Sequence, residues 1–363
     1  MTTGHTRARP LNRRRALFEI GGAACALSGV AAFARTATPS AGAGPAPVNM
    51  VRPPRLRNGD VLGLVAPAGF IADRFGLDQM GETVRTMGLE PRFAPHLTDR
   101  EGYLAGSDEV RAHDLMAMFR DDGVRAVMAV RGGWGSARLL PYLDFAAIRR
   151  SPKLFTGFSD NTALHMALVR NGIVSIHGPN ASASWPQAAW ESFRAVAFEG
   201  AMPTYSVPAY AGPNLGGRGP ATKMLHPGKA RGRLLGGNLS VLTALVGTPY
   251  LPDFTGAILF LEETNEAEYR IDRMLTQLAL AGILGKVAGV VFGQCTHCEN
   301  PDGGFGNFTI YEVLDRRFAQ LGVPAFQGAA IGHIAGQVSM PQGCMAEIDA
   351  DAGTIRLLEP AVV

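Results

Sequence analysis

Short apolar runs alternate with segments of helical periodicity between residues 60 and 179. The strand-like runs read "DVLGLVAPAG", "LEPRFA", "VRAVMAVRGG", "KLFTGFS" and "IVSIHGP". The helical patterns between them read "FGLDQMGETVRTMG", "GSDEVRAHDLMAMFRDDG", "GSARLLPYLD" and "DNTALHMALVRNG". Strands that alternate with helices are typical of a mostly parallel sheet covered on both faces. The pattern therefore predicts an α/β domain.

Residues 203–235 interrupt this alternation, because Pro and Gly are dense there and helical periodicity is lost. We therefore predict an interdomain linker at 203–235, between an N-terminal α/β domain (51–202) and a C-terminal α/β domain (236–363). The C-terminal part again alternates, with a strand at "GAILFLEE" and a long amphipathic helix at "NEAEYRIDRMLTQLALAGIL". Its last residues, "AEIDADAGTIRLLEP", predict a hairpin.

The basic charge of the chain is concentrated at its N-terminus. The formal net charge is +3, from 34 Lys and Arg against 31 Asp and Glu. Five of these arginines and one of these acids precede residue 35, which leaves 29 basic against 30 acidic residues in the rest. The net charge of the folded part therefore gives no support for a nucleic-acid partner or an anionic membrane surface.

Residues 1–34 resemble an export signal. Arg14 and Arg15 precede a mildly apolar, Gly/Ala-rich stretch, and small residues follow around Ala32 and Ala34. The arginine pair is typical of twin-arginine signals, and the alternative is a disordered basic tail. The apolar stretch is too short and too glycine-rich for a stable membrane span. We expect a linker at 35–50 and a periplasmic or exported protein after signal removal.

The cysteines do not indicate a metal site. Cys295 and Cys298 form a single C-x-x-C motif, and a zinc site would need a second pair of ligands at suitable spacing, which is not evident. The pattern favours thiols in the core or lining a pocket, and a disulfide is the alternative in an exported protein. We therefore predict no metal.

Ligands of open α/β sheets bind beyond the carboxyl ends of the strands. The residues at the predicted strand ends are Pro67-Ala68-Gly69, Arg131-Gly132-Gly133-Trp134-Gly135, Gly157-Phe158-Ser159-Asp160, His177-Gly178-Pro179, Glu262-Glu263 and Gly332-His333. The glycine-rich run does not continue as G-x-G-x-x-G, since Arg138 stands where the last glycine would be. No G-x-x-x-x-G-K-[ST] loop is present either, so the sequence gives little support for a nucleotide cofactor.

Ser159 stands at a predicted strand-to-helix turn. A serine on a sharp turn of this kind exposes its hydroxyl, and the next N–H lies at a helix N-terminus that favours negative charge. The G-x-S-x-G elbow is incomplete because Asn161 replaces the last glycine. Taken alone, a helix cap is the simpler interpretation of this serine.

A nucleophilic serine needs a base and an acid that orients the base. His333 and His177 both follow predicted strands, whereas His165 lies well into the helix after Ser159. Glu262 and Glu263 end an apolar strand, where an unpaired carboxylate would be costly to bury. The spacing leaves open which histidine and which glutamate would act with Ser159.

Eight motifs in order resemble those of the serine LD-carboxypeptidases (muramoyltetrapeptide carboxypeptidases) and the related microcin-immunity hydrolases. They are "VAPAG", "YLAGSDEVRAHDL", "RGGWGSARLLPYLD", "GFSDNTALH", "HGP", "GRLLGGNLSVLTALVGTPY", "LFLEETNEAEYRIDRMLTQL" and "IGHIAGQVSMPQG". The resemblance extends from about residue 55 to about residue 357. It implies a doubly wound, mostly parallel N-terminal α/β domain joined to a smaller, swivelling C-terminal α/β domain.

The resemblance also implies a catalytic triad of Ser159, His333 and Glu262. The oxyanion hole would be the backbone N–H groups of Asp160 and Gly133. Family members use no metal or other cofactor and are commonly homodimers. The implied reaction is hydrolysis of the bond before a C-terminal D-Ala in a peptidoglycan tetrapeptide, with a muropeptide as the binding partner.

Three further residues are candidates for substrate binding. Arg131 could meet a substrate carboxylate, Trp134 replaces a tyrosine common in the family, and Asn238 lies in "GGNL". The export signal departs from the cytoplasmic murein-recycling members. Two alternatives stay open: a hydrolase of peptidyl- or aminoacyl-nucleotide antibiotics, for which Trp134 would stack on adenine, and a non-catalytic muropeptide-binding protein.

Overall fold

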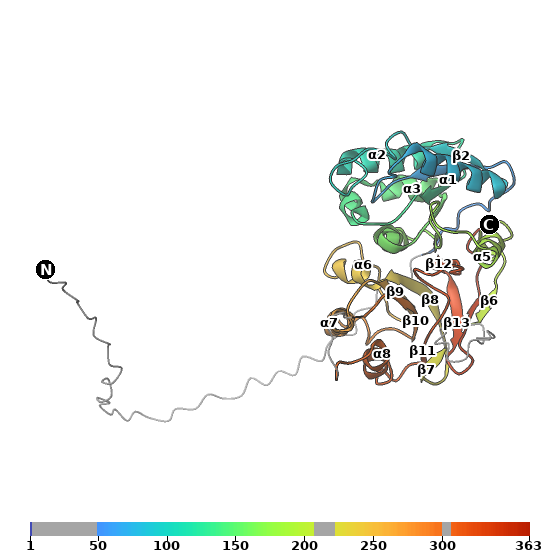
Figure 1. Cartoon of the computed structure of the whole chain (residues 1–363). Helices are drawn as coiled ribbons and strands as arrows, with labels where there is room; N and C mark the ends of the chain where they lie inside the picture. Colours follow the sequence, from blue (N-terminus) through green and yellow to red (C-terminus); the bar gives the residue numbers. More distant parts are fainter. Residues whose placement is uncertain (2–48, 207–221, 300–305) are drawn as a thin grey trace, which may run out of the picture. The chain divides into compact units, whose positions relative to one another are not determined.

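A computed structural model describes residues 1, 49–206, 222–299 and 306–363. Apart from Met1 and residues 49–50, the predicted export signal (1–34) and linker (35–50) lie outside the described residues. One compact unit, Pro47–Val363, holds two β-sheets (Figure 1). Within the described ranges, no helix has the combined length and apolar character that crossing a bilayer requires.

The first sheet has the predicted parallel strands. Its order is β12-β5-β4-β3-β1-β2, and all neighbours except the β12–β5 pair are parallel. The strands are β1 (Val61–Val65), β2 (Glu90–Phe93), β3 (Ala126–Ala129), β4 (Leu154–Gly157), β5 (Ser175–His177) and β12 (Met340–Gln342). The strand order reverses between β1 and β3, and the loops after these two strands meet there, where the N–H of Gly69 donates to the carbonyl of Gly132 (3.3 Å). A ligand crevice is expected at such a reversal.

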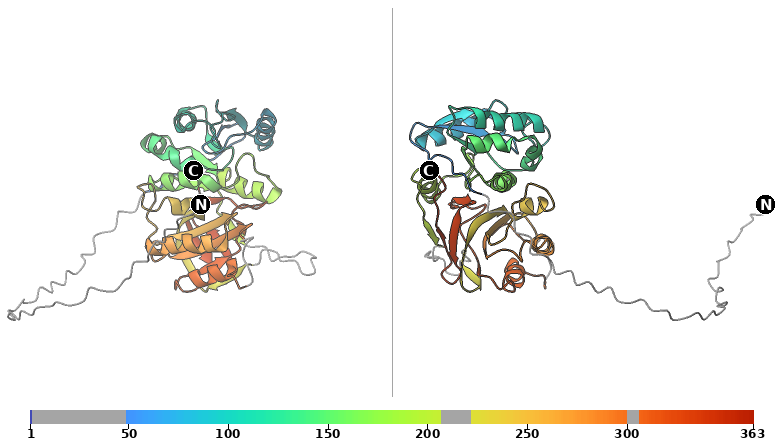
Figure 2. Two further views of the ribbon diagram at one scale, coloured as in Figure 1. Left: turned by 60° about the vertical axis from the view of Figure 1, so that its left-hand side comes forward. Right: turned by 180° about the vertical axis from the view of Figure 1, so that it is seen from behind.

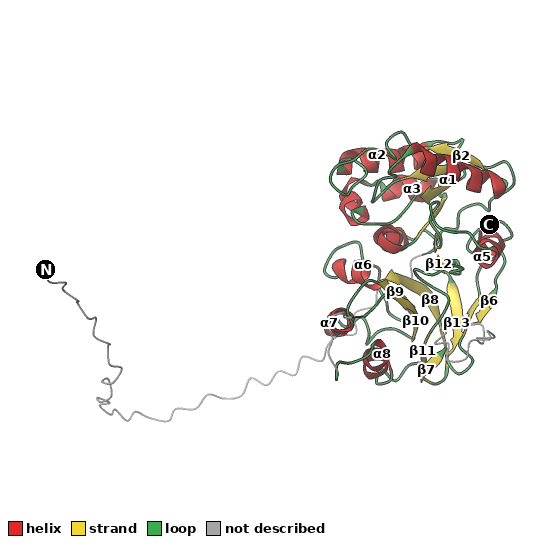
Figure 3. Cartoon of the chain, in the orientation of Figure 1, coloured by secondary structure: helices red, strands yellow, loops and turns green. Residues whose placement is uncertain are grey.

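Helices cover this sheet, as Figures 1 and 3 show. They are α1 (Arg74–Thr86), α2 (Asp108–Arg120), α3 (Phe145–Arg150), α4 (Thr162–Arg170) and α5 (Gln187–Ala197). Ser107 caps α2 as the sequence predicts, because its side chain accepts from the N–H of Val110. The predicted helix in "GSARLLPYLD" is instead a 3₁₀ segment, Ser136–Tyr142. Pro141 lies inside this segment, and its missing N–H and its ring do not permit a regular α-helix.

The second sheet is mixed, in the order β6-β14-β13-β8-β9-β10-β11-β7, with β8 to β11 parallel. Its strands are β6 (Thr204–Ser206), β7 (Lys223–His226), β8 (Lys229–Asn238), β9 (Ile258–Thr264), β10 (Gly289–Thr296), β11 (Ala325–Gln327), β13 (Met345–Asp349) and β14 (Thr354–Leu357). The helices α6 (Leu239–Ala244), α7 (Glu268–Leu280) and α8 (Ile310–Phe318) accompany it, and α7 packs beside α8 (Figure 2). The two sheets with their helices confirm the predicted α/β class, and β13 and β14 form the predicted hairpin.

The predicted linker 203–235 passes from the first sheet to the second. Its described residues contribute β6, β7 and most of β8 to the second sheet, and 207–221 lie outside the described residues. The chain later returns, because β12 pairs with β5 in the first sheet. The two sheets are therefore connected by more than one passage of the chain.

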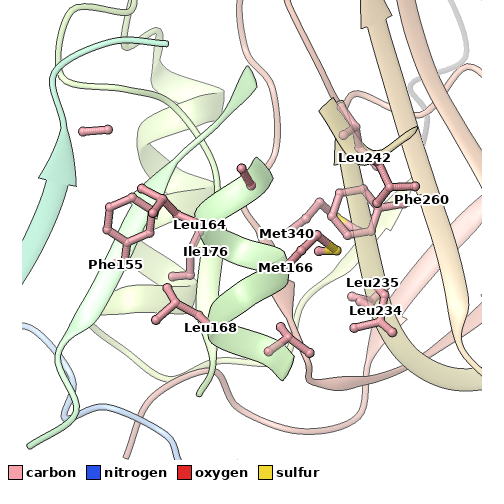
Figure 4. Close-up of a cluster of buried hydrophobic side chains, with 14 of the residues drawn as sticks. Phe155, Leu164, Met166, Leu168, Ile176, Leu234, Leu235, Leu242, Phe260 and Met340 are labelled. Carbon is pink, nitrogen blue, oxygen red and sulfur yellow. The ribbon is translucent and has the colours of Figure 1, made fainter. Parts of the chain in front are cut away.

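Helix α4 packs against both sheets and follows directly after the turn that carries Ser159. Every residue from Thr162 to Val169 is buried, as expected for a helix without a solvent-facing side. Figure 4 shows Leu164 and Leu168 on the side of Phe155, and Met166 on the side of Met340. Each such buried side chain contributes about 1.5–3 kcal/mol, so the start of α4 is held firmly in place.

Candidate active site

Ser159 lies on a strained turn between β4 and α4. The strand ends at Gly157, and a single 3₁₀ turn, Ser159–Asn161, leads into the helix. Ser159 has a φ of 63°, in the left-handed region that costs a side-chain-bearing residue about 1–2 kcal/mol. Strain of this kind is retained where the surrounding structure enforces it, and it is the backbone geometry of a nucleophile elbow.

A neighbouring glycine makes room for this turn. A Cβ atom at Gly132 would lie 2.9 Å from Cβ and 3.2 Å from Oγ of Ser159. Any larger residue at this position would displace the serine, so the glycine of the predicted "RGGWG" loop is required by close approach to the turn.

His333 connects Ser159 to a buried acid. Nε2 of His333 lies 2.9 Å from Oγ of Ser159, and Nδ1 lies 2.7 Å from Oε2 of Glu262. A carboxylate only accepts hydrogen bonds, so Nδ1–H donates to Glu262 and Nε2 accepts from the serine hydroxyl. Ser159 follows β4 of the first sheet, whereas Glu262 lies within β9 of the second, so the geometry needs both sheets.

The loop before His333 fits closely over Glu262. Gly332 has a φ of 110°, and a Cβ atom there would lie 2.8 Å from both Cβ and Oε2 of Glu262. The carboxylate is fully buried, and His333 covers its one hydrogen-bonded oxygen. Only glycine can bring the backbone this close to the acid.

Glu262 and Glu263 point to opposite faces of β9, as neighbours in a strand do. Glu263 accepts from Nδ2 of Asn238 (3.0 Å), from Oγ of Ser240 (2.7 Å) and from the N–H of Thr264 (2.8 Å). Burial raises the pKa of Glu263, and these donors oppose the rise. Asn238, the N-cap of α6, is thus bound to Glu263. Glu262 is the glutamate that faces His333.

The other candidate histidine, His177, lies behind the site together with His165. Nε2–H of His165 donates to the carbonyl of Gly157 (2.8 Å), which leaves Nδ1 to accept from the hydroxyl of Ser175 (2.8 Å). His177 is completely buried, neither of its ring nitrogens has a partner among the described residues, and burial lowers its pKa well below the usual value. Its ring lies 6.0 Å from that of His165. Both histidines are packed neutral into the interior that supports the turn.

We expect acid to destabilise the fold through these histidines. Burial lowers the pKa of His165 to about 4 from 6.5. The unfolded chain then binds the extra proton between these pH values, so the free energy of unfolding falls as pH drops from about 6.5 to about 4, by about 3 kcal/mol for this group. Denaturant unfolding at several pH values measures the slope. His165→Asn should reduce it and the exposed His113→Asn should not; an equal slope in all three proteins contradicts the explanation.

A cavity of about 340 Å³ opens above Ser159. Arg131, Gly133 and His333 line it with the serine. No carboxylate within the described ranges pairs with Arg131, whose Nη1 donates to the carbonyl of Phe70 (3.3 Å). Asp160, by contrast, is buried, and its Oδ2 accepts from the N–H of Ser136 (2.7 Å).

The structure does not bring all of the predicted substrate-binding residues to this cavity. Trp134 is 55% exposed and lies edge-on to Tyr103, with ring centroids 5.7 Å apart, but it is not among the lining residues. Asn238 is buried at the start of α6 and does not line the cavity either. Of the three candidates, Arg131 alone lines the cavity that contains Ser159.

Sequence reasoning missed Asn180, which braces the turn that carries Ser159. Its Oδ1 accepts from the N–H of Phe158 (3.1 Å) and from Nδ2 of Asn161 (3.2 Å), and it lines the cavity. Asn180 directly follows the strand-end motif His177-Gly178-Pro179. Its position immediately after a strand-end motif could therefore have marked Asn180 as a site residue.

Cys295 and Cys298 form a disulfide, which was the alternative to the favoured thiols. The bridge lies at the end of β10, where Cys295 is paired with Glu263 in the sheet. Between the cysteines, the hydroxyl of Thr296 donates to the carbonyl of His333 (3.1 Å). The bridged turn therefore contacts the backbone of the loop that carries the histidine. Across the part of the chain described, no cluster of three His, Cys, Asp or Glu side chains could hold a metal.

Comparison with known proteins identifies the family. Residues 62–178 match the model of the LD-carboxypeptidase N-terminal domain, and residues 231–348 match that of the C-terminal domain. The chain is 36% identical to the "probable murein peptide carboxypeptidase" of Bacillus subtilis, across 82% of this chain and 91% of that protein. It is 27% identical to the microcin C7 self-immunity protein MccF of Escherichia coli, across 71% of this chain and 80% of that protein.

A solved structure agrees with the sequence comparison. The crystal structure of the muramoyltetrapeptide carboxypeptidase of Oxalobacter formigenes superposes with a TM-score of 0.71 and 30% identity, over 82% of this chain and 97% of that one. Both halves of the chain thus match LD-carboxypeptidase domains in sequence, and the fold of the whole matches that of a carboxypeptidase. The chain belongs to the LD-carboxypeptidase family.

Proposed function

We propose that this protein is a serine LD-carboxypeptidase that releases D-Ala from the C-terminus of peptidoglycan tetrapeptides. The hydrogen-bonded series Glu262–His333–Ser159 is the observation that supports the proposal most strongly. It joins an acid, a base and a hydroxyl in the order that acyl transfer needs. The similarity to murein peptide carboxypeptidases supports the substrate class.

In the proposed mechanism, Nε2 of His333 takes the proton of Ser159 as Oγ attacks the carbonyl before the terminal D-Ala. Glu262 keeps the imidazole in the tautomer with its lone pair on Nε2 and stabilises the imidazolium that forms. His333 then gives the proton to the leaving amine, and D-Ala departs. Water, activated by the same histidine, hydrolyses the acyl-enzyme.

The backbone N–H groups of Asp160 and Gly133 are the proposed oxyanion hole. Asp160 directly follows the serine at the start of the helical segment, and Gly133 lines the cavity beside it. Donors of this kind are worth about 3 kcal/mol each in the transition state of acyl transfer. The buried bond from Ser136 to the side chain of Asp160 helps to hold that N–H in position.

Arg131 is the proposed partner of the substrate's terminal carboxylate. We expect Arg131→Gln to lower kcat/KM for a tetrapeptide by about 10- to 100-fold, since a hydrogen bond to a charged group contributes about 1.5–3 kcal/mol. Steady-state kinetics on a tetrapeptide and on its C-terminal amide measure this. For the wild type, kcat/KM should be much lower on the amide than on the tetrapeptide. For Arg131→Gln, kcat/KM should be similar on the two substrates. An equal loss on both substrates contradicts the assignment.

Release of D-Ala tests the function itself. Purified protein lacking residues 1–34 is incubated with a disaccharide-tetrapeptide, and mass spectrometry follows the loss of one alanine. Release by the wild type and none by Ser159→Ala would support both the activity and the nucleophile. No release by folded wild-type protein would contradict the proposal.

The second candidate is hydrolysis of an aminoacyl- or peptidyl-nucleotide, as the similarity to MccF suggests. The exposed aromatic pair Tyr103 and Trp134 favours it, because Trp134 directly follows Gly133 in the chain and the pair presents aromatic rings for a nucleobase to stack on. Aspartyl sulfamoyl adenosine, which appears in one MccF structure, is the discriminating substrate. Faster turnover of this compound than of the tetrapeptide, lost in Trp134→Ala, would favour the second candidate.

Export and assembly are further parts of the proposal. The twin-arginine pattern of residues 1–34 supports delivery to the periplasm or beyond, where the substrate would be the cell wall itself. The family resemblance supports a homodimer. Fractionation of cells that express the full chain tests the first, and sedimentation of the purified protein tests the second.

A further inference from the structure

A second cavity, larger than the one at Ser159, lies between α1 and the start of α5. Its volume is about 730 Å³, within the range of small-molecule sites. We call it the α1–α5 cavity, and its walls are residues of α1 and of the segment 181–190. None of the proposed catalytic residues lines it, so the mechanism gives it no role.

The α1–α5 cavity adjoins the cavity at Ser159. Ile71, Ser182 and Ala183 line both. The shared wall is fixed to the first sheet, because the N–H of Ser182 donates to the carbonyl of Val130 (2.9 Å). The two cavities are therefore neighbours, and a ligand long enough to pass these shared residues would contact both. Arg131, the proposed carboxylate partner, lines only the smaller cavity.

Two indole rings give the α1–α5 cavity a rigid aromatic wall. Trp185 packs edge-on against the buried Phe193, with centroids 5.4 Å apart, and its Nε1 donates to the carbonyl of Asn180 (3.2 Å). Trp190 packs against Phe193 and Phe198. Both indoles remain partly exposed. Because they are already braced, a ligand that stacks on them loses little of its binding energy to ordering side chains.

The rest of the lining mixes apolar and polar residues and carries almost no charge. Gln79, Thr83, Thr86, Ser184 and Gln187 supply amides and hydroxyls. Among the described residues, Glu82 is the only ionisable one that lines the cavity, and Arg85 pairs with it at 2.6 Å. No lysine, arginine or histidine of the described ranges lines the cavity. A phosphate or a carboxylate would find no cationic partner here, which disfavours a nucleotide and the acidic part of a stem peptide.

Amphipathic neutral ligands suit such a surface. The C–H face of a pyranose ring packs on indole, while its hydroxyl and N-acetyl groups exchange hydrogen bonds with amide and hydroxyl side chains. The amide of Gln79 is exposed and has no partner in the described part of the chain, so it is available for such a bond. In peptidoglycan the stem peptide is attached to the glycan through its N-terminus, so the sugar lies on the side of the scissile bond away from the leaving D-Ala.

We propose that the α1–α5 cavity binds the neutral N-acetylated sugars of the muropeptide, so that the preferred substrate is the glycan-linked tetrapeptide. This inference rests on the proposed carboxypeptidase activity. Sugar binding in a cavity away from the reacting bond adds affinity that a peptide without its glycan cannot gain. The cavity thereby selects substrates that still carry their glycan.

Kinetics on two substrates test the proposal. For the wild type, we expect kcat/KM to be at least about tenfold higher on the disaccharide-tetrapeptide than on the free tetrapeptide. Trp190→Ala should reduce this ratio to near one. The exposed Gln79→Ala, which should fold normally, should reduce it by about threefold to tenfold. The matched control is Gln320→Ala, at a glutamine that lines a different cavity beside α8 and should leave the ratio unchanged.

A binding experiment separates this proposal from the activity. N,N′-diacetylchitobiose, a neutral disaccharide, is titrated into Trp134→Phe protein, whose remaining tryptophans are Trp185 and Trp190. Saturable quenching, weakened by Gln79→Ala, is expected even if no substrate is cleaved. Cleavage of both peptides with a ratio of one and no saturable quenching would overturn the sugar site and leave the carboxypeptidase proposal standing. Cleavage of neither peptide would instead count against the activity.

Discussion

Ser159→Ala is expected to lower kcat for D-Ala release by about 10⁶-fold while the protein keeps its fold. Loss of the nucleophile removes the covalent route completely, and losses of this size follow removal of the serine in other serine hydrolases. The alanine takes the same left-handed backbone conformation and keeps every backbone hydrogen bond of the turn. The melting temperature should therefore change by no more than a few degrees, and KM or inhibitor binding should persist.

The matched control is Ser151→Ala, at an exposed serine after α3. It should retain wild-type kcat within about twofold. A quenched assay with excess enzyme measures the residual rate of Ser159→Ala, and circular dichroism establishes that the variants fold. A residual rate within about tenfold of the wild type would contradict nucleophilic catalysis by Ser159 and would direct attention to a water activated by His333.

Local patterns predicted the parts of this fold that depend on neighbours in sequence. Buried runs such as β3 and β4, the cap at Ser107 and the final hairpin follow from residues a few positions apart. Strand β12 could not be found this way. It has only three residues, and its pairing with β5 joins positions more than 160 residues apart. Its existence depends on tertiary packing rather than on local preference.

The candidate site divides along the same line. The turn after β4 and the two acids near the end of β9 were visible as polar residues that end apolar runs. Alternation along a strand separates Glu262 from Glu263 but does not say which one faces the cleft, and only the family resemblance favoured Glu262. The structure separates them through Asn238 and Ser240, which occupy Glu263. Whether a side chain such as Trp134 lines a cavity depends on contacts distant in sequence.

Glu262→Gln is expected to lower kcat by about 10⁴-fold with little change in KM. The carboxylate accepts the proton on Nδ1 of His333, which leaves the lone pair on Nε2 to accept from Ser159. A glutamine amide can donate to Nδ1, which favours the tautomer with the proton on Nε2 and removes the base that the serine needs.

Measurement of kcat and KM on the disaccharide-tetrapeptide checks the expectation, with Glu263→Gln as the matched control on the opposite face of the strand. The control should lose stability, because four donors around Glu263 lose a carboxylate partner, yet it should keep kcat within about tenfold. If instead the two variants lost kcat equally, the effect of Glu262 would be structural, because only Glu262 contacts the imidazole that must change its protonation state in every turnover. The comparison therefore separates the role of Glu262, which orients the histidine, from that of Glu263, which only binds the start of α6 to the sheet.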